Sequence, residues 1–165
     1  MIASATVQFH NVVLFVHILS VVLAFGPTFA YGVFITAAQR EGGAAVPAVG
    51  RGILTWDRTA GTIGMTLILL TGMYLTSYDG SPWEFSQFFV SWGFVAILAL
   101  FGLSHGFFIP QTKQAIELAE RDLKEGDGAL SAEFEEKSAL LGKVGPVAGV
   151  IVILTVYVMT VKPFL

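Results

Sequence analysis

The chain opens with MIASATVQFHNVVLFVHILSVVLAFGPTFAYGVFITAAQ, residues 1–39, which contain no Asp, Glu, Lys or Arg. Three more stretches of this kind follow at residues 59–78, 85–112 and 144–161. Each is long enough to cross the hydrocarbon core of a bilayer, which is about 30 Å thick and takes about 20 helical residues. The runs are apolar on all sides and longer than the roughly 10-residue alternating strands of a membrane barrel. The sequence therefore predicts four membrane-spanning helices.

The composition also indicates a lipid environment. Of the 165 residues, 55% are hydrophobic and 13% are charged, whereas a soluble domain carries about 25% charged residues. The mean hydropathy is +0.74. These values exclude a soluble enzyme and a disordered tail. The net charge of −3 argues against nucleic acid as a partner, because nucleic-acid binders present a basic face.

We therefore predict an all-α polytopic membrane protein, a single integral domain over residues 1–165 with an up-down bundle of helices. The expected helices lie near residues 12–38, 53–78, 85–109 and 144–164. Residues 110–143 form a charged link in which apolar residues recur at helical spacing. Within it, the Gly-Asp-Gly sequence at residues 126–128 predicts a turn. Ser131 can cap the helix that follows. We expect this link to be a cytoplasmic helical hairpin that extends the third and fourth helices beyond the lipid.

The basic residues predict the orientation. If the helices alternate in direction, eight of the 9 Lys and Arg residues fall on one side of the membrane and only Lys162 on the other. Because basic residues are enriched in cytoplasmic loops, both termini should lie outside. The N-terminal segment has no basic residue before its long apolar run, which favours a retained first helix over a cleaved signal peptide.

Small residues and one proline indicate how the helices pack. Small pairs at a spacing of four allow backbones to approach closely, either within the chain or in a homo-oligomer; they include Ala60/Gly64, Gly102/Gly106 and Gly145/Gly149. Pro27 lies in the middle of the first helix and removes the hydrogen bond to the Leu23 carbonyl. Thr28 or a neighbouring helix could satisfy that carbonyl. Pro27 thus marks a static kink, a hinge, or an opened backbone carbonyl that faces a ligand.

Ionisable side chains within membrane spans are functional candidates, because their burial in lipid is costly. His17 is expected roughly 8 Å below the outer surface, and Met73 and Met159 fall at a similar depth on the second and fourth helices. A histidine with one or two thioethers suits copper(I), or haem b held by a His/Met pair. The alternative is ordinary packing, with His17 hydrogen-bonded between helices.

A second polar level is expected near the inner surface. His105 lies roughly 6 Å from that surface, with Tyr31, Asp57 and Arg58 at a similar depth. Asp57 and Arg58 point about 100° apart on the helix, so they cannot both face the same neighbour. An Asp–His pair could carry protons or bind a cation, or it could be a structural polar clasp. His17 and His105 lie in opposite leaflets, so they should not share one haem iron.

Part of the sequence resembles a known family. His17-Ile18-Leu19-Ser20, followed by AFGPTFAY at residues 24–31, resembles a bacterial family of predicted four-helix integral membrane proteins classed as a domain of unknown function. Arg58, Gly61 and the long link before the last helix also fit. The resemblance implies an inner-membrane bundle without an established activity. A more distant similarity, to copper-resistance D-type membrane proteins and the haem-binding membrane protoporphyrinogen oxidase, rests on a His near the start of the first helix and implies copper or haem chemistry.

Taken together, these features favour a non-enzymatic component or accessory subunit of a membrane complex. Its surroundings would be the lipid bilayer, with a homo-oligomer or a larger membrane complex as partner. Two alternatives stay open: a redox protein that binds haem or copper through His17, and a small ion or proton transporter that uses Tyr31, Asp57 and His105. We expect a multi-pass protein of the bacterial inner (plasma) membrane with both termini outside.

Overall fold

Helices make up nearly all of the molecule. The structure, a computed structural model, describes residues 2–125 and 129–164. Its helical segments are α1 (Ile2–Phe25), α2 (Thr28–Arg40), α3 (Val46–Trp56), the π-helix η1 (Asp57–Gly61), α4 (Thr62–Ser77), α5 (Phe88–Leu103), the π-helix η2 (Ser104–Phe108), α6 (Ile109–Glu125) and α7 (Ala132–Val161). No strand occurs in the described ranges.

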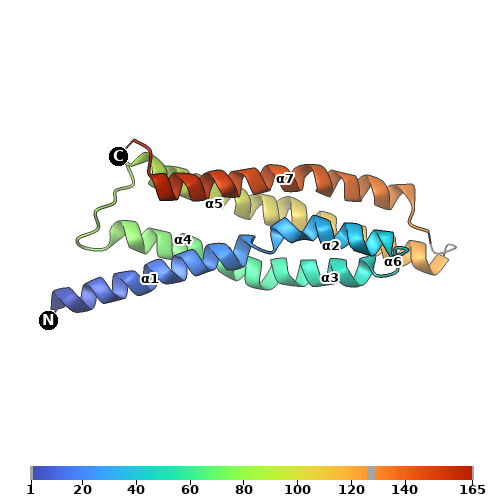
Figure 1. Cartoon of the computed structure of the whole chain (residues 1–165), viewed down its shortest axis with the longest axis horizontal. Helices are drawn as coiled ribbons and strands as arrows, with labels where there is room; N and C mark the ends of the chain where they lie inside the picture. Colours follow the sequence, from blue (N-terminus) through green and yellow to red (C-terminus); the bar gives the residue numbers. More distant parts are fainter. Residues whose placement is uncertain (1, 126–128, 165) are drawn as a thin grey trace.

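These segments join into four long helices that run up and down in a bundle (Figure 1). Each is long and apolar enough to cross a membrane: Gln8–Arg40, Val46–Ser77, Phe88–Glu125 and Ala132–Val161. The predicted all-α fold with four spanning helices is confirmed. The start of α1 and the end of α7 lie at one end of the bundle, which we call the terminal end (Figure 1).

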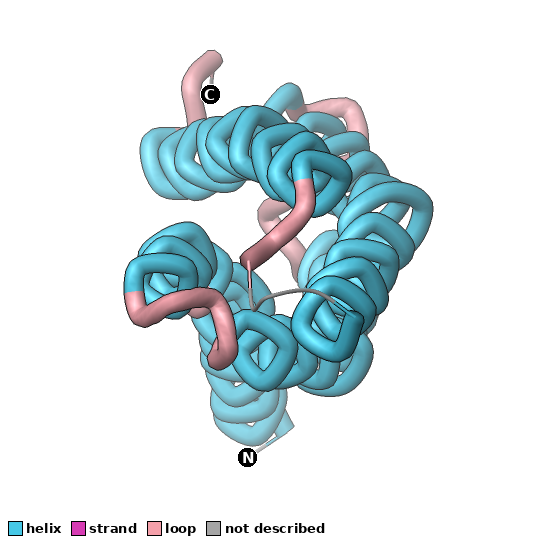
Figure 2. Tube along the Cα trace, turned by 90° about the vertical axis from the view of Figure 1, so that its right-hand side faces the viewer, coloured by secondary structure: helices cyan, strands magenta, loops and turns pink. Residues whose placement is uncertain are grey.

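We call the opposite end the basic end. At this end α2 ends and α3 begins, and α6 ends and α7 begins (Figure 1). Figure 2 looks along the bundle from this end and shows the helices grouped around a common axis. The name reflects the basic residues on the segments nearest this end, which are Arg40, Arg51, Arg58, Lys113, Arg121, Lys124, Lys137 and Lys143.

The helices reach further toward the basic end than the apolar runs indicate. α3 begins at Val46 rather than near residue 53, α6 continues to Glu125 rather than ending near 109, and α7 begins at Ala132 rather than near 144. The apolar runs mark only the lipid-soluble part of each helix. Backbone hydrogen bonds continue through amphipathic flanks, whose apolar stripe packs on neighbouring helices.

α6 and the first part of α7 pack against each other. Ser131 caps α7 as expected, since its hydroxyl accepts from the Phe134 N–H at 3.3 Å. The Ser131 N–H in turn donates to Asp122 Oδ2 at 2.8 Å. Lys137 Nζ donates to Gln111 and Gln114 of α6 at 2.8 and 2.7 Å. The turn expected at residues 126–128 lies outside the described residues.

Three apolar clusters follow one another along the bundle. Their buried members are Phe89, Val90 and Val158 in the terminal cluster; Ala24, Met65, Ile68 and Ile97 in the middle cluster; and Ala38, Val46, Ala115, Ala119 and Phe134 in the basic-end cluster. Apolar packing is therefore divided among three groups along the bundle rather than continuous.

The break between α1 and α2 occurs at Pro27. The Leu23 carbonyl, deprived of its helical donor, accepts from Trp56 Nε1 of α3 at 3.3 Å. Thr28 Oγ1 donates to the Phe25 carbonyl instead, at 2.6 Å. A Cβ at Gly26 would lie 2.5 Å from the Val22 carbonyl oxygen, so glycine is required before the proline. A neighbouring helix thus satisfies the freed carbonyl, which favours a fixed kink over a free hinge.

The glycines of the small-residue pairs fall into two groups, those with a close neighbouring helix and those without one. A Cβ at Gly64 of α4 would lie 2.9 Å from Ala24 Cβ and 3.1 Å from the Ser20 carbonyl oxygen of α1, so this glycine permits the close approach that the sequence predicts. A Cβ at Gly102, Gly106 or Gly145 would meet no atom within 4 Å. At those three positions the expected close contact within the chain does not form.

Candidate functional site

A cavity of about 590 Å³ lies between the middle and basic-end clusters. Its walls come from α1 to α7 and from both π-helices, and most of its lining residues are apolar. Toward the terminal end it reaches Ala24 and Met65, and toward the basic end it reaches Val46 and Phe134. Because these residues belong to the packed clusters, side chains close the cavity along the bundle axis in both directions.

The cavity opens sideways, between α2 and α7. Gly32 and Thr36 of α2 and Gly142 and Pro146 of α7 line it, yet they are exposed. Residues that are exposed and also line a cavity mark its opening. We call this opening the lateral mouth.

Two contacts between α2 and α7 bound the lateral mouth. Toward the terminal end, a Cβ at Gly149 would lie 3.3 Å from Phe29 Cε1. Toward the basic end, Gln39 Nε2 donates to Ser138 Oγ at 3.5 Å. The glycines between these contacts have open space within 4 Å of an added Cβ; they are Gly32, Gly142 and Gly145. Ten residues separate Phe29 from Gln39, which corresponds to roughly 15 Å of helix.

A polar group lies on the cavity wall. The Tyr31 hydroxyl donates to Asp57 Oδ1 at 2.8 Å, and both residues line the cavity. Asp57 is the first residue of η1, whose wide turn replaces α-helical geometry at this point. π-helical turns within α-helices occur frequently at functional sites.

His105 joins this group through a threonine. His105 Nε2 lies 3.2 Å from Thr62 Oγ1, and Thr62 Oγ1 donates to the Asp57 backbone carbonyl at 2.9 Å. His105 Nδ1 lies 3.1 Å from the Phe101 carbonyl oxygen. The two π-helices η1 and η2 are therefore linked side to side. Of the neighbours Asp57 and Arg58, Asp57 faces the cavity, and Arg58 is exposed without an ion pair among the described residues.

The three residues expected at the other level have separate surroundings. His17 Nδ1 lies 2.8 Å from Thr71 Oγ1 of α4. Met159 packs on α5, since a Cβ at Gly93 would lie 1.9 Å from Met159 Cε, and Met73 is 48% exposed. Within residues 2–125 and 129–164, no group of three or more His, Cys, Asp or Glu is placed to hold a metal ion.

The two histidines bond to different levels of α4. Thr71, the partner of His17, and Thr62, the partner of His105, are nine residues apart in the helix. That spacing corresponds to roughly 13 Å along the axis. This distance agrees with the expectation that the two rings do not share one iron.

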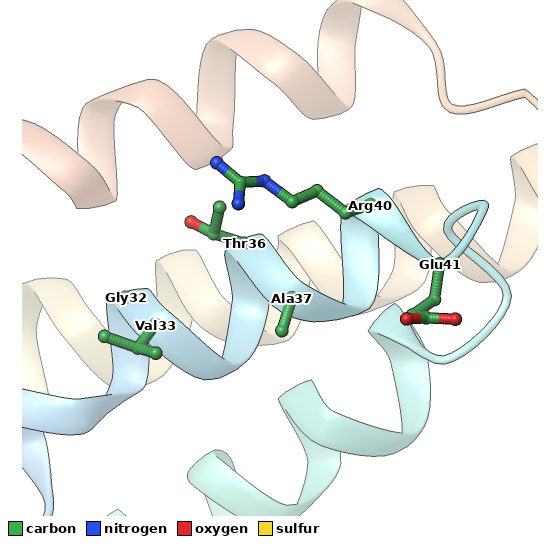
Figure 3. A pocket seen from close by; sticks show the side chains of 6 residues that line it. All are labelled: Gly32, Val33, Thr36, Ala37, Arg40 and Glu41. Carbon is green, nitrogen blue, oxygen red and sulfur yellow. The ribbon is translucent and has the colours of Figure 1, made fainter.

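A shallower hollow of about 440 Å³ adjoins the lateral mouth on α2 (Figure 3). It shares Gly32 and Thr36 with the cavity and also includes Arg40 and Glu41. In Figure 3 the Arg40 side chain runs back toward Thr36, whereas the Glu41 carboxylate points to the opposite side of α2. No carboxylate forms an ion pair with Arg40 in the part of the chain that the structure describes.

Sequence reasoning did not identify the mouth residues Gly32, Thr36, Arg40 and Gly142 as a site. The available signal was weak: three glycines recur at helical spacing at 142, 145 and 149, and Thr36 lies one turn before Arg40. The same spacing also marks tight helix contacts, so it could not by itself indicate open space.

A family model matches residues 11–163, described as "Predicted integral membrane protein (DUF2269)". No curated protein and no solved structure matches the chain. The match spans all four long helices and both polar levels, in agreement with the resemblance carried by residues 17–31. The chain therefore belongs to the DUF2269 family of predicted integral membrane proteins, a domain of unknown function.

Proposed function

We propose that the protein binds one small hydrophobic or amphipathic molecule in the cavity, as a binding component of the membrane rather than an enzyme. The cavity itself carries this proposal. Protein interiors contain few voids larger than a water molecule, whereas ligand pockets measure about 300–1,000 Å³ and combine apolar walls with a few polar groups. A cavity of about 590 Å³ with the Tyr31–Asp57 bond on its wall has both properties.

The shape of the cavity supports binding over passage across the membrane. Packed clusters close it along the bundle axis, and the opening between α2 and α7 faces sideways. A molecule dissolved in the surrounding lipid would reach this opening without crossing water. The ligand would therefore come from the bilayer.

Native mass spectrometry of the protein released from a mild detergent tests this proposal. The wild-type chain should carry a small-molecule adduct, and Gly145→Leu should lose it by filling the cavity. Gly52→Leu is the matched control, because Gly52 of α3 also has open space but does not line the cavity. Adducts that are equally abundant on both variants would contradict the proposal.

Proton or cation transfer is a second candidate, favoured by the polar group at η1 and η2. Tyr31 bonds to Asp57, and Thr62 connects the Asp57 backbone to His105. Carboxylates and histidines at membrane depth often serve proton relays. Liposomes that contain the purified protein should then show flux that stops in Asp57→Asn. Flux equal to that of empty liposomes would exclude this role.

We also propose that the protein resides in the bacterial inner membrane with its basic end in the cytoplasm and both termini outside. The gathering of eight basic residues toward one end of the bundle supports this orientation. A periplasm-active reporter fused to the C-terminus should be active, and the same reporter inserted after Gly42, in the connection between α2 and α3, should not. The reverse pattern would contradict this topology.

Finally, we propose that the protein belongs to a larger membrane assembly, either a homo-oligomer or a complex with other subunits. Exposed glycines on one face of α5 and η2, Gly102 and Gly106, support it, because close helix contacts in membranes favour small residues. Crosslinking in intact membranes followed by mass measurement should give a species heavier than one chain. A single-chain mass at every crosslinker concentration would contradict this assignment.

A further inference from the structure

We propose that the ligand of the cavity is a single-chain anionic amphiphile, a long-chain carboxylate, whose headgroup pairs with Arg40 at the lateral mouth. This inference rests on the proposed binding function and names its substrate class. It follows from the polarity of the cavity along its length, its volume, and the charges at its opening.

The polarity of the cavity changes along its length. Toward the terminal end, most of its lining is apolar and includes Ala24, Met65 and Val152. The polar residues there are Thr28, whose hydroxyl donates to the Phe25 carbonyl, and Ser104. Toward the basic end, it gains the side chains of Thr36, Gln39, Thr112 and Ser138. A molecule with an apolar chain and a polar head matches this gradient in one direction only, with its head toward the basic end.

The volume favours one chain. At roughly 30 Å³ for each methylene, about the volume of one water in the liquid, the cavity of about 590 Å³ holds about 20 methylenes. That is one acyl chain of the length found in membrane lipids. A two-chain phospholipid would have to leave most of one chain outside the lateral mouth.

The charges at the mouth favour an anionic head. Arg40 has no carboxylate partner in the described ranges, and the neighbouring Glu41 points to the opposite side of α2. The guanidinium fork matches a carboxylate with two parallel hydrogen bonds. Asp57, the one carboxylate on the cavity wall, would repel an anion that entered head first. The head therefore stays at Arg40 while the chain extends inward.

The lateral mouth offers a route for the chain. Between the Phe29–Gly149 contact and the Gln39–Ser138 hydrogen bond, α2 and α7 present glycines with open space in front of them. Arg40 follows Gln39 directly, so it lies at the basic-end limit of this opening. A carboxylate at Arg40 would leave its chain facing the glycine-lined gap.

Photolabelling of the purified protein tests the inference. The probe is palmitic acid with a diazirine on its chain, and the competitors are palmitate, hexadecanol and hexadecyltrimethylammonium. Label should appear on peptides of α2 and α7, and palmitate should compete at a concentration about tenfold lower than hexadecanol. Arg40→Gln should remove this difference and Arg40→Lys should retain part of it. Lys143→Gln is the matched control, since Lys143 is an exposed cation of α7 outside the cavity.

The outcomes separate the inference from the function on which it rests. If Gly145→Leu removes the label but hexadecanol competes as well as palmitate, the cavity binds a ligand and the anionic headgroup is wrong. A phosphatidylglycerol that competes better than palmitate would also overturn the single-chain carboxylate. If label persists in Gly145→Leu, both proposals fall. Gly142→Leu, at a second glycine with open space, replaces Gly145→Leu should that variant not fold.

Discussion

Glycines serve opposite purposes at two places where helices face each other, between α1 and α4 and between α2 and α7. Gly64 lets α1 and α4 touch, because any side chain there would collide with Ala24 and the Ser20 backbone. Gly32, Gly142 and Gly145 face open space beside a cavity. Small residues close the contact between α1 and α4 and leave space between α2 and α7. We call the part of the bundle around Gly64 the packed half and the part around the cavity the hollow half.

This difference assigns stability and function to different parts of one chain. In lipid, helices associate through close packing rather than through the hydrophobic effect, so the α1–α4 contact should contribute more to the free energy of unfolding than the gap between α2 and α7. The hollow half contains both π-helices and the Tyr31–Asp57 bond. Matched variants in the two halves test this division.

The largest difference is expected between two glycine variants. Gly64→Leu should lower the free energy of unfolding by about 3 kcal/mol, because overpacking against backbone forces α1 and α4 apart. Gly145→Leu should change it by less than about 0.5 kcal/mol, since its side chain enters empty space. Unfolding in detergent by titration with dodecyl sulfate measures both. Equal losses would contradict the division between a packed and a hollow half.

A smaller loss is expected from the polar group of the hollow half. Tyr31→Phe leaves the half-buried Asp57 without its hydroxyl donor and should lower the free energy of unfolding by about 1–3 kcal/mol. Tyr157→Phe is the control, because Tyr157 is 57% exposed on the outside of α7. Stability of the two variants is compared by the same titration. If Tyr31→Phe is as stable as the control but loses proton flux, the bond serves transport rather than structure.

Features that depend on local pattern could be predicted from the sequence. Length and absence of charge indicate the four spans, and the position of Ser131 before a helical pattern indicates its cap. The level shared by Tyr31, Asp57 and His105 follows from counting residues inward from the ends of the apolar runs. The alternatives for the carbonyl freed by Pro27 included a neighbouring helix, and Trp56 of α3 is that donor.

Features that depend on which helix faces converge could not be predicted. The cavity requires α2 and α7 to separate between Phe29 and Gln39, and no residue pattern on either helix alone determines that distance. The π-helices add a wide turn at Asp57 and at Ser104, and this changes which side chains face the neighbours afterwards. His105 therefore bonds to Thr62. The positions of these residues along their helices did not predict this contact.

Thr71→Val removes the hydroxyl bonded to His17. This variant should lower the free energy of unfolding by about 1 kcal/mol. This bond lies in the packed half, so we expect His17 to act in packing and the purified protein to lack a Soret band. Visible absorption and copper analysis of the wild type check the second expectation. A Soret band or bound copper that disappears in His17→Ala would instead support the redox hypothesis and place a cofactor in the packed half.

The smallest effect is expected at the basic end, for the ion pair between Arg51 of α3 and Glu120 of α6. The two side chains are 57% and 36% exposed, so Arg51→Gln should lower the free energy of unfolding by roughly 0.2–1 kcal/mol. Raising the salt concentration to about 1 M should remove this difference, because the screening length then falls to about 3 Å. Salt can screen the pair only if water surrounds it. A cost that persists at high salt would mean that lipid covers this part of the basic end, and the proposed extension of the helices into the cytoplasm would then be wrong.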